Sequence, residues 1–195
     1  MAVEESMILS QFQTVGRDLF TRGLVSSHSG NLSIRLAERL FITRRGSMLG
    51  SLGEQDLIET GISKNNRVTP LATVELPVHR AIYKQTPALA IVHAHPPHAV
   101  ALSLAETEIV PNAELFAVIG RVPVINQDMK AGPWELADVI AQTLKESRIV
   151  MVRGHGSFAI GQLLEEAYGF TTALEESCQV ICLLKSLRVG STKNS

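Results

Sequence analysis

The sequence predicts an α/β protein in which a central mixed, mostly antiparallel sheet is covered by helices on both faces. Short runs of apolar and β-branched residues alternate with stretches that carry apolar residues at helical spacing. Two of the short runs lie close enough together to pair as a hairpin, which favours antiparallel neighbours. With 195 residues, 45% of them hydrophobic and 19% charged, the chain is long enough for a single domain spanning residues 1–195.

The N-terminal part is expected to form one helix and two strands. Residues 5–24 place apolar side chains three and four apart, and Gly23 follows as a C-cap. A small polar loop then leads into residues 32–36, where apolar residues alternate with polar ones at the period of a half-buried strand. Residues 39–43 form a second strand that ends at the turn RRGS. We expect these two strands to pair.

The middle of the chain is expected to contain a helix, a buried strand and a second helix. Residues 69–85 have helical spacing, and Pro77 lies near enough to the start of this helix to be tolerated. Glu75 would then lie in the first helical turn. Residues 88–95 are a nearly continuous apolar run ended by two prolines, which is typical of a central strand buried on both faces. A helix at about 98–105 follows.

The C-terminal part continues the alternation. Residues 122–125 and 149–152 are β-branched runs that flank a predicted helix at 133–147. A further strand at 157–160 resumes after a Gly-His-Gly turn. The stretch 163–187 is the strongest helical pattern in the chain.

The composition argues against several classes of function. Eighteen Lys plus Arg against nineteen Asp plus Glu give a net charge of −1, without the basic stripe that nucleic-acid binding needs. The N-terminus carries acids where a signal peptide has a basic start, and no apolar run approaches the roughly 20 residues of a membrane span. We therefore expect a cytoplasmic protein. Cys178 and Cys182 lie four apart in a helical pattern and read as small buried side chains rather than a disulfide or redox pair.

His93 and His95 are the first candidates for chemistry. They are two apart on a predicted strand, so both imidazoles point to the same side. Two neighbouring histidines at the end of an apolar strand would be poor core residues, because their ring nitrogens need polar partners. The pair is therefore interpreted as ligands of a divalent metal ion.

His155 is the natural third ligand. It sits between two glycines after a strand, where a sharp turn can carry the ring into a cleft; by itself it could equally be a turn histidine in solvent. Three neutral imidazoles with one open position are typical of a catalytic zinc site, although another divalent ion such as Mn²⁺ or Co²⁺ would also fit. The remaining histidines are interpreted as accessory: His28, His79 and His98.

Glu75 and two polar turns complete the candidate site. In isolation Glu75 could be a carboxylate favoured by a helix start. Near a divalent ion it could instead be a fourth ligand or the general base. The turns at residues 29–33 and 44–47 carry glycines, and Arg44 or Arg45 offers a guanidinium group to an anion. Neither turn matches a nucleotide-binding motif.

Five segments in this order and spacing resemble the class II aldolase/adducin family: SGNLSIR, FITRRG, TVELPVHRAIY, VHAHPPHAVALS and VRGHGSFAIG. The resemblance covers nearly the whole chain. Within the family the chain is most similar to L-fuculose-1-phosphate aldolases. The resemblance implies a sandwich of helices around a sheet and a homotetramer of C4 type with active sites near subunit interfaces.

The resemblance also implies roles for individual residues. Zn²⁺ would be held by His93, His95 and His155, and Glu75 would be the catalytic acid/base that can also touch the metal. The reaction implied is cleavage of L-fuculose 1-phosphate, or a similar ketose 1-phosphate, to dihydroxyacetone phosphate and an aldehyde through a metal-stabilised enediolate. The phosphate of this substrate would lie among six residues: Gly30, Asn31, Arg45, Gly46, Thr73 and Val74.

Three positions depart from the family pattern. Val74 stands where many sugar-phosphate members have a hydroxyl residue, and Arg45 replaces a small hydroxyl residue. A family tyrosine that reaches into the neighbouring site falls near Leu115. The same metal site could therefore serve ribulose-phosphate 4-epimerisation, methylthioribulose-phosphate dehydration or aromatic-acid decarboxylation. A non-catalytic module like the adducin head is a third reading, but such a module has no reason to keep all three histidines and the glutamate.

Overall fold

A single eight-stranded sheet forms the centre of the molecule, in the order β3-β2-β1-β4-β8-β7-β6-β5. The computed structural model describes residues 3–126 and 133–191 of the chain. Among the described strands, β6 and β7 pair in parallel and all other neighbours are antiparallel. The expected mixed, mostly antiparallel sheet is therefore confirmed. The strands are β1 (Asn31–Leu36), β2 (Arg39–Thr43), β3 (Leu57–Gly61), β4 (Ala90–Ala94), β5 (Glu108–Ile109), β6 (Val122–Ile125), β7 (Ile149–Val152) and β8 (Gly156–Gly161).

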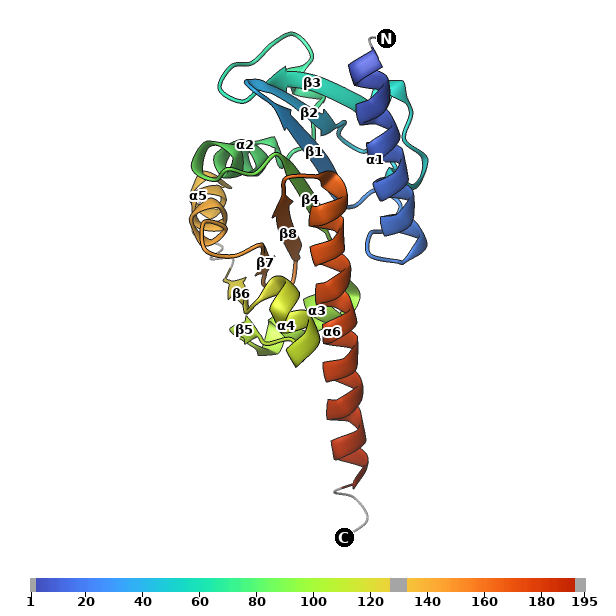
Figure 1. The fold of residues 1–195 in the computed structure, drawn as a ribbon, viewed down its shortest axis with the longest axis vertical. Helices are drawn as coiled ribbons and strands as arrows, with labels where there is room; N and C mark the ends of the chain where they lie inside the picture. The colour runs from blue at the N-terminus through green and yellow to red at the C-terminus, as the bar shows by residue number, and fades with distance from the viewer. Residues whose placement is uncertain (1–2, 127–132, 192–195) are drawn as a thin grey trace.

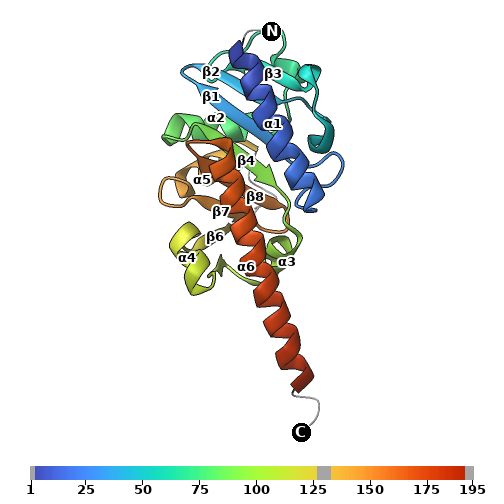
Figure 2. The same ribbon diagram turned by 45° about the vertical axis from the view of Figure 1, so that its right-hand side comes forward.

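Helices cover both faces of this sheet, as the sequence predicts. Helices α2 and α5 pack on one face, while α1, α3, α4 and α6 pack on the other (Figures 1 and 2). Three short 3₁₀ helices lie in the connections: η1 (Leu49–Ser51), η2 (Glu54–Asp56) and η3 (Thr69–Leu71). The α-helices are α1 (Val3–Thr21), α2 (Leu76–Gln85), α3 (Pro97–Ala105), α4 (Ala113–Ile119), α5 (Pro133–Thr143) and α6 (Leu164–Ser191).

The alternation of side chains along β4 divides the interior into two cores. Val92 and its neighbours two residues away face the core beneath α1, α3, α4 and α6, whereas Ile91 faces the core beneath α2 and α5. All five residues of β4 are buried, which confirms a central strand covered on both sides. His93 is two residues from Ile91 and therefore lies on the α2 side of the sheet.

The predicted helix at 69–85 begins too early. Residues Thr69–Leu71 form the 3₁₀ helix η3, Ala72 is extended, and α2 starts only at Leu76. A continuous helix would have placed Pro77 in its interior, where proline lacks the N–H for the helical hydrogen bond and clashes with the preceding turn. Proline is accommodated in the first turn instead. Glu75 is consequently the residue just before α2, not a residue of its first turn.

Three short elements have no counterpart among the predicted ones: β3, β5 and α4. Strand β3 has alternating burial, with Ile58 and Thr60 inward, but its residue types do not alternate in step, because Thr60 is polar on the inward face and Leu57 is apolar on the other. Strand β5 has two residues and α4 has seven, both below the length at which periodicity is informative. Helix α5 ends at Thr143, four residues before the predicted end.

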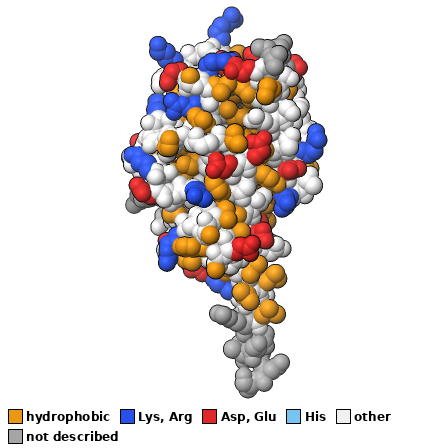
Figure 3. Space-filling model, in the orientation of Figure 1, with side chains coloured by type: hydrophobic (Ala, Val, Ile, Leu, Met, Phe, Trp, Pro, Cys, Tyr) orange, Lys and Arg blue, Asp and Glu red, His pale blue; other side chains and the backbone are white. Residues whose placement is uncertain are grey.

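Helix α6 extends well beyond the body of the molecule (Figures 1 and 2). Hydrophobic side chains gather on its projecting part in the space-filling view (Figure 3), where Leu183, Leu184 and Leu187 are each at least half exposed. Earlier in this helix, Cys178 is buried, as expected, whereas Cys182 is only partly buried, and both thiols are free. No helix within the described ranges is long and apolar enough to cross a membrane.

Candidate active site

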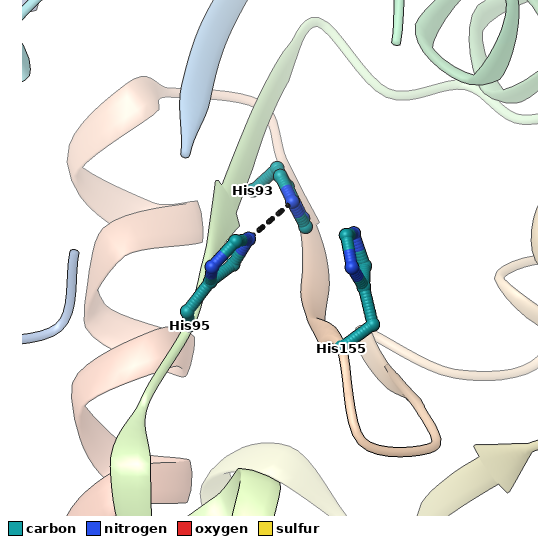
Figure 4. A group of neighbouring side chains, drawn as sticks. All are labelled: His93, His95 and His155. Atoms are coloured by element: carbon teal, nitrogen blue, oxygen red, sulfur yellow. Dashed lines mark hydrogen bonds between the residues drawn. The ribbon is translucent and has the colours of Figure 1, made fainter. Parts of the chain in front are cut away.

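The three predicted histidine ligands come together at one end of the central strands (Figure 4). His93 lies on β4, His95 follows the end of that strand, and His155 stands in the turn between β7 and β8. One nitrogen from each ring lies within 4.8 Å of the others. Two of these rings come from one strand and its end, and the third is brought in by the pairing of β8 with β4.

The tautomer of His93 is set by its surroundings. Its Nδ1 lies 2.9 Å from the carbonyl oxygen of Ser157, which can only accept, so Nδ1–H is the donor. Burial lowers the pKa of His93 against the attraction of Glu75, which keeps the ring neutral. The lone pair of His93 therefore resides on Nε2, which points at the other site residues. A backbone carbonyl that orients a ligand imidazole in this way is common in metal sites.

His95 and His155 complete the trio with different exposure. The Nε2 atoms of His95 and His93 are 2.9 Å apart. Burial, with a smaller contribution from the neighbouring histidines, lowers the pKa of His95 to about 4. His155 stacks on His93 with ring centroids 5.0 Å apart, and its side chain is 39% exposed. The site thus has one buried histidine, one half-buried histidine and one that faces the opening.

Glu75 approaches the trio from the start of α2. Its Oε1 lies 3.1 Å from Nε2 of His155, and its Oε2 lies 3.1 Å from Nε2 of His93. The Asn31 amide donates a hydrogen bond of 2.6 Å to Oε2. Burial alone would raise the pKa of Glu75, but the charge that His93 carries when protonated and the hydrogen bonds from His155 and Asn31 act in the opposite direction and hold this pKa below its ordinary value.

The donor set fits a divalent cation. The bare lone pair of His93 Nε2 faces the ionised Glu75 Oε2 at 3.1 Å, so two acceptors oppose each other without a proton between them. Two acceptors at this distance repel unless a positive charge lies close to both. Three imidazole nitrogens with an adjacent carboxylate are the ligand types that zinc and similar ions take in proteins.

A cavity of about 330 Å³ opens on this cluster. Four of its lining residues are Glu75 and the three histidines. All six positions proposed for phosphate line the same cavity: Gly30, Asn31, Arg45, Gly46, Thr73 and Val74. Four further lining residues are not among these six: His28, Ser29, Arg44 and Ser47. The sequence already indicates Arg44 as the alternative guanidinium group for an anion. Ser29, Arg44 and Ser47 belong to the two polar turns, and His28 directly precedes the first of them.

Several groups that can receive an anion lie at the rim of this cavity. Among the described residues, no partner occupies the guanidinium groups of Arg44 and Arg45 or the backbone N–H groups of Gly46 and Val74. Val74 is 66% exposed and therefore accessible to a ligand. Because its side chain has no polar atom, the backbone N–H is the group that it can offer. Positive charge and free N–H donors together are suited to a phosphate.

Two residues have contacts that sequence reasoning did not foresee. The Asn31 side chain lies between Glu75 and His79. His79, interpreted as accessory, is completely buried and hydrogen-bonded behind the site. For His79, the sequence feature that could have indicated this contact is its spacing, because Glu75 and His79 are four residues apart on one helical face. His98 is directed elsewhere, toward Glu175 on α6.

Comparison with known proteins identifies relatives over nearly the whole chain. The family model of the class II aldolase and adducin N-terminal domain matches residues 10–182. An L-fuculose phosphate aldolase of Methanococcus maripaludis is 31% identical over 185 residues, covering 93% of this chain and 99% of the relative. The crystal structure of L-fuculose-1-phosphate aldolase from Thermus thermophilus superposes with a TM-score of 0.88 at 36% identity, covering 94% of this chain and 96% of that one.

Another relative of this chain has a different activity. A 3-oxo-tetronate 4-phosphate decarboxylase of Escherichia coli is 26% identical over 188 residues, covering 92% of this chain and 88% of the relative. The extent of the family match and the length over which the relatives align identify the chain as a member of the class II aldolase/adducin family.

Proposed function

We propose that this chain is a metal-dependent aldehyde-lyase that cleaves L-fuculose 1-phosphate, or a similar ketose 1-phosphate, to dihydroxyacetone phosphate and an aldehyde. The observation that carries the proposal is the position of the Glu75 carboxylate, 3.1 Å from two of the three converging histidines and on the wall of a cavity with a cationic rim. The aldolases of M. maripaludis and T. thermophilus support the choice of substrate.

His93, His95 and His155 are the residues that would hold the ion, and zinc is the ion we propose. When bound, a divalent ion supplies Lewis-acid stabilisation of negative charge that develops on the substrate oxygens. The protein orients the ligands for this purpose, since the Ser157 carbonyl fixes the His93 ring and leaves its Nε2 free.

Glu75 moves the proton. In the direction of condensation, the ionised carboxylate takes a proton from the carbon next to the carbonyl and an enediolate forms; in cleavage the same carboxyl returns the proton to that carbon. The hydrogen bond from Asn31 to Oε2 holds one carboxylate oxygen, while Oε1 contacts only the more exposed His155 among the contacts above. Glu75 can therefore act at the opening of the site.

The rim binds the phosphate in this proposal. The guanidinium of Arg45 and the N–H groups of Gly46 and Val74, which have no partner within the described part of the chain, replace the water lost by the phosphate oxygens. Asn31, Thr73 and Gly30 line the same wall, although the Asn31 amide is already engaged with Glu75.

The homotetramer implied by the family resemblance and the cytoplasmic location stay predictions. The exposed apolar side chains on the projecting part of α6 are consistent with burial against other subunits (Figure 3).

A retro-aldol assay tests the proposed function. Release of dihydroxyacetone phosphate from L-fuculose 1-phosphate is followed with purified protein, with protein stripped by a chelator, and with stripped protein given Zn²⁺, Mn²⁺ or Co²⁺. We expect turnover to disappear on stripping and to return with a divalent ion. Unchanged turnover in protein verified as metal-free would contradict the mechanism, and a protein that binds no divalent ion at all would favour the non-catalytic module.

A second reading keeps the metal site and changes the reaction. Val74 supplies no side-chain donor to the cavity. Leu115 lies near the sequence position at which the family has its tyrosine, and one relative is a decarboxylase. A panel that contains ribulose 5-phosphate, methylthioribulose 1-phosphate, a 3-oxo-tetronate 4-phosphate and aromatic acids separates epimerisation, dehydration and decarboxylation from aldol cleavage. Activity on a non-phosphorylated acid alone would exclude the aldolase.

A further inference from the structure

A row of buried polar side chains runs from Glu75 into the core between α2 and β1. Asn31 donates to Glu75 Oε2 at 2.6 Å, and its Oδ1 lies 2.5 Å from Nε2 of His79. Nδ1 of His79 lies 2.6 Å from Oγ of Ser33, and this Oγ lies 2.8 Å from the hydroxyl of Tyr83. The four residues behind Glu75 are each at most 5% exposed.

Two regular elements build this row. Glu75, His79 and Tyr83 follow each other at intervals of four residues and so share one face of α2 and the residue before it. Asn31 and Ser33 are two apart on β1 and share the face of the sheet that α2 covers. The row is therefore a consequence of packing one helical face on one strand.

The direction of every hydrogen bond in the row can be assigned. The Asn31 Oδ1 atom only accepts, so His79 donates from Nε2–H. Burial lowers the pKa of His79 to about 3, so the ring is neutral and its Nδ1 accepts from Ser33. The Tyr83 hydroxyl then donates to Ser33. Each donor is directed toward Glu75.

The row ends inside the protein, at a Tyr83 side chain that is 1% exposed. Among the described residues, Ser33 is the only hydrogen-bond partner of the Tyr83 hydroxyl. A relay that exchanged protons with solvent would need an exit at this end. Buried polar groups are costly unless each is satisfied, so a fully satisfied row without an exit is suited to fixing geometry.

We propose that Asn31 and His79 are positioning residues that hold Glu75 Oε2 in place, so that Oε1 is presented to the substrate carbon. The inference rests on the proposed role of Glu75 as the proton-transferring residue. His79 acts by fixing the amide plane of Asn31: with Nε2–H bonded to Oδ1, the Nδ2 group must face the carboxylate. Ser33 and Tyr83 fix the His79 tautomer.

The assay that isolates this step is exchange of a carbon-bound proton of dihydroxyacetone phosphate for deuterium in D₂O, followed by NMR without any aldehyde. His79→Leu removes the donor to Asn31, whereas His79→Gln keeps an amide donor on a side chain of similar reach. We expect His79→Leu to lower the maximal exchange rate by roughly 10- to 100-fold, with little change in the half-saturating concentration and in bound metal. His79→Gln should recover most of this loss.

Ser33→Ala provides a milder second variant if His79→Leu fails to fold. It removes one hydroxyl, and Ser177→Ala is its matched control, because Ser177 is also buried and its Oγ has no partner among the described residues. We expect Ser33→Ala to slow exchange by roughly fivefold through loss of the fixed His79 tautomer. Ser177→Ala should exchange at the wild-type rate.

The outcomes separate the inference from the proposed function. Wild-type protein that catalyses no exchange with any divalent ion would overturn the proposed function itself. Wild-type exchange together with a His79→Leu rate within about twofold of it would overturn only the positioning role. A His79→Gln rate as low as that of a folded His79→Leu, a parallel loss of metal, or equal rates for Ser33→Ala and Ser177→Ala would overturn it as well.

Discussion

Acidification should destabilise the metal-free protein through His79, by an amount that follows from its burial. The imidazole is 0% exposed and is enclosed by Asn31, Ser33 and the ring of Phe158. Burial is the main cause that lowers its pKa from 6.5 to about 3, while the charge of Glu75 opposes the shift and His93 adds to it. Protonation would also leave two donors on a ring whose Nδ1 is needed as an acceptor.

The sign of the effect is fixed by which state binds the proton first. As pH falls below the unfolded value of 6.5, the unfolded chain becomes protonated while the folded one does not, until pH approaches 3. The contribution of His79 to the free energy of unfolding is therefore fully retained above pH 6.5, and between pH 6.5 and about 3 it declines by about 1.4 kcal/mol per pH unit. At pH 5 the loss from His79 amounts to about 2 kcal/mol.

Urea unfolding of chelator-treated protein measures this loss. Wild type and His79→Gln are compared at about pH 7.5 and about pH 5, because glutamine does not titrate and the other groups contribute to both proteins. We expect wild type to lose about 2 kcal/mol more than the variant between the two conditions. An equal pH dependence of the two proteins would refute the assignment of a buried neutral imidazole at this position.

Three substitutions test the metal site and the base. Glu75→Gln should retain most of the bound metal and lose turnover by roughly 10²- to 10⁴-fold, because an amide cannot carry the proton; metal analysis and the retro-aldol assay measure the two properties. His95→Ala should lose stoichiometric metal in the same analysis, because a three-histidine site cannot spare one ligand. Gly156→Ala should lower metal affinity by roughly tenfold, because the added Cβ would lie 2.5 Å from the Ala94 carbonyl oxygen and 2.6 Å from the His95 ring. Gly169→Ala, which meets nothing within 4 Å, is its matched control for a competitive chelator titration.

Each of these expectations has a clear contrary result. Normal turnover by Glu75→Gln would remove Glu75 from the role of base. Stoichiometric metal in His95→Ala would show that the ion lies elsewhere. Equal metal affinity in Gly156→Ala and Gly169→Ala would show that β8 can shift away from the added methyl group without moving the ligands.

The sequence predicted the strands and the long helices wherever the periodic spacing of apolar residues extends over enough positions. The two-residue period of 32–36 and the buried run at 88–95 correspond to β1 and β4, and the helical spacing after residue 163 corresponds to α6. Strand β5 has only two residues and is defined by its pairing with β6 at the edge of the sheet, so the local sequence pattern could not predict it. Helix α2 starts late because Pro77 is tolerated only in the first turn of a helix. The spacing of apolar residues does not show this restriction.

By itself, the sequence determined the ligand types of the proposed metal site and the side of the strand on which two of them lie. His93 and His95 are fixed relative to each other by the backbone, because alternate residues of one strand share a face. Tertiary structure alone decided what surrounds them. Asn31 reaches Glu75 across 44 residues and His155 reaches it across 80. The pairing of β1 with β4 positions Asn31, and the pairing of β8 with β4 positions His155. Strand register and helix packing are collective results of burying two cores, so no local spacing encodes the row behind Glu75.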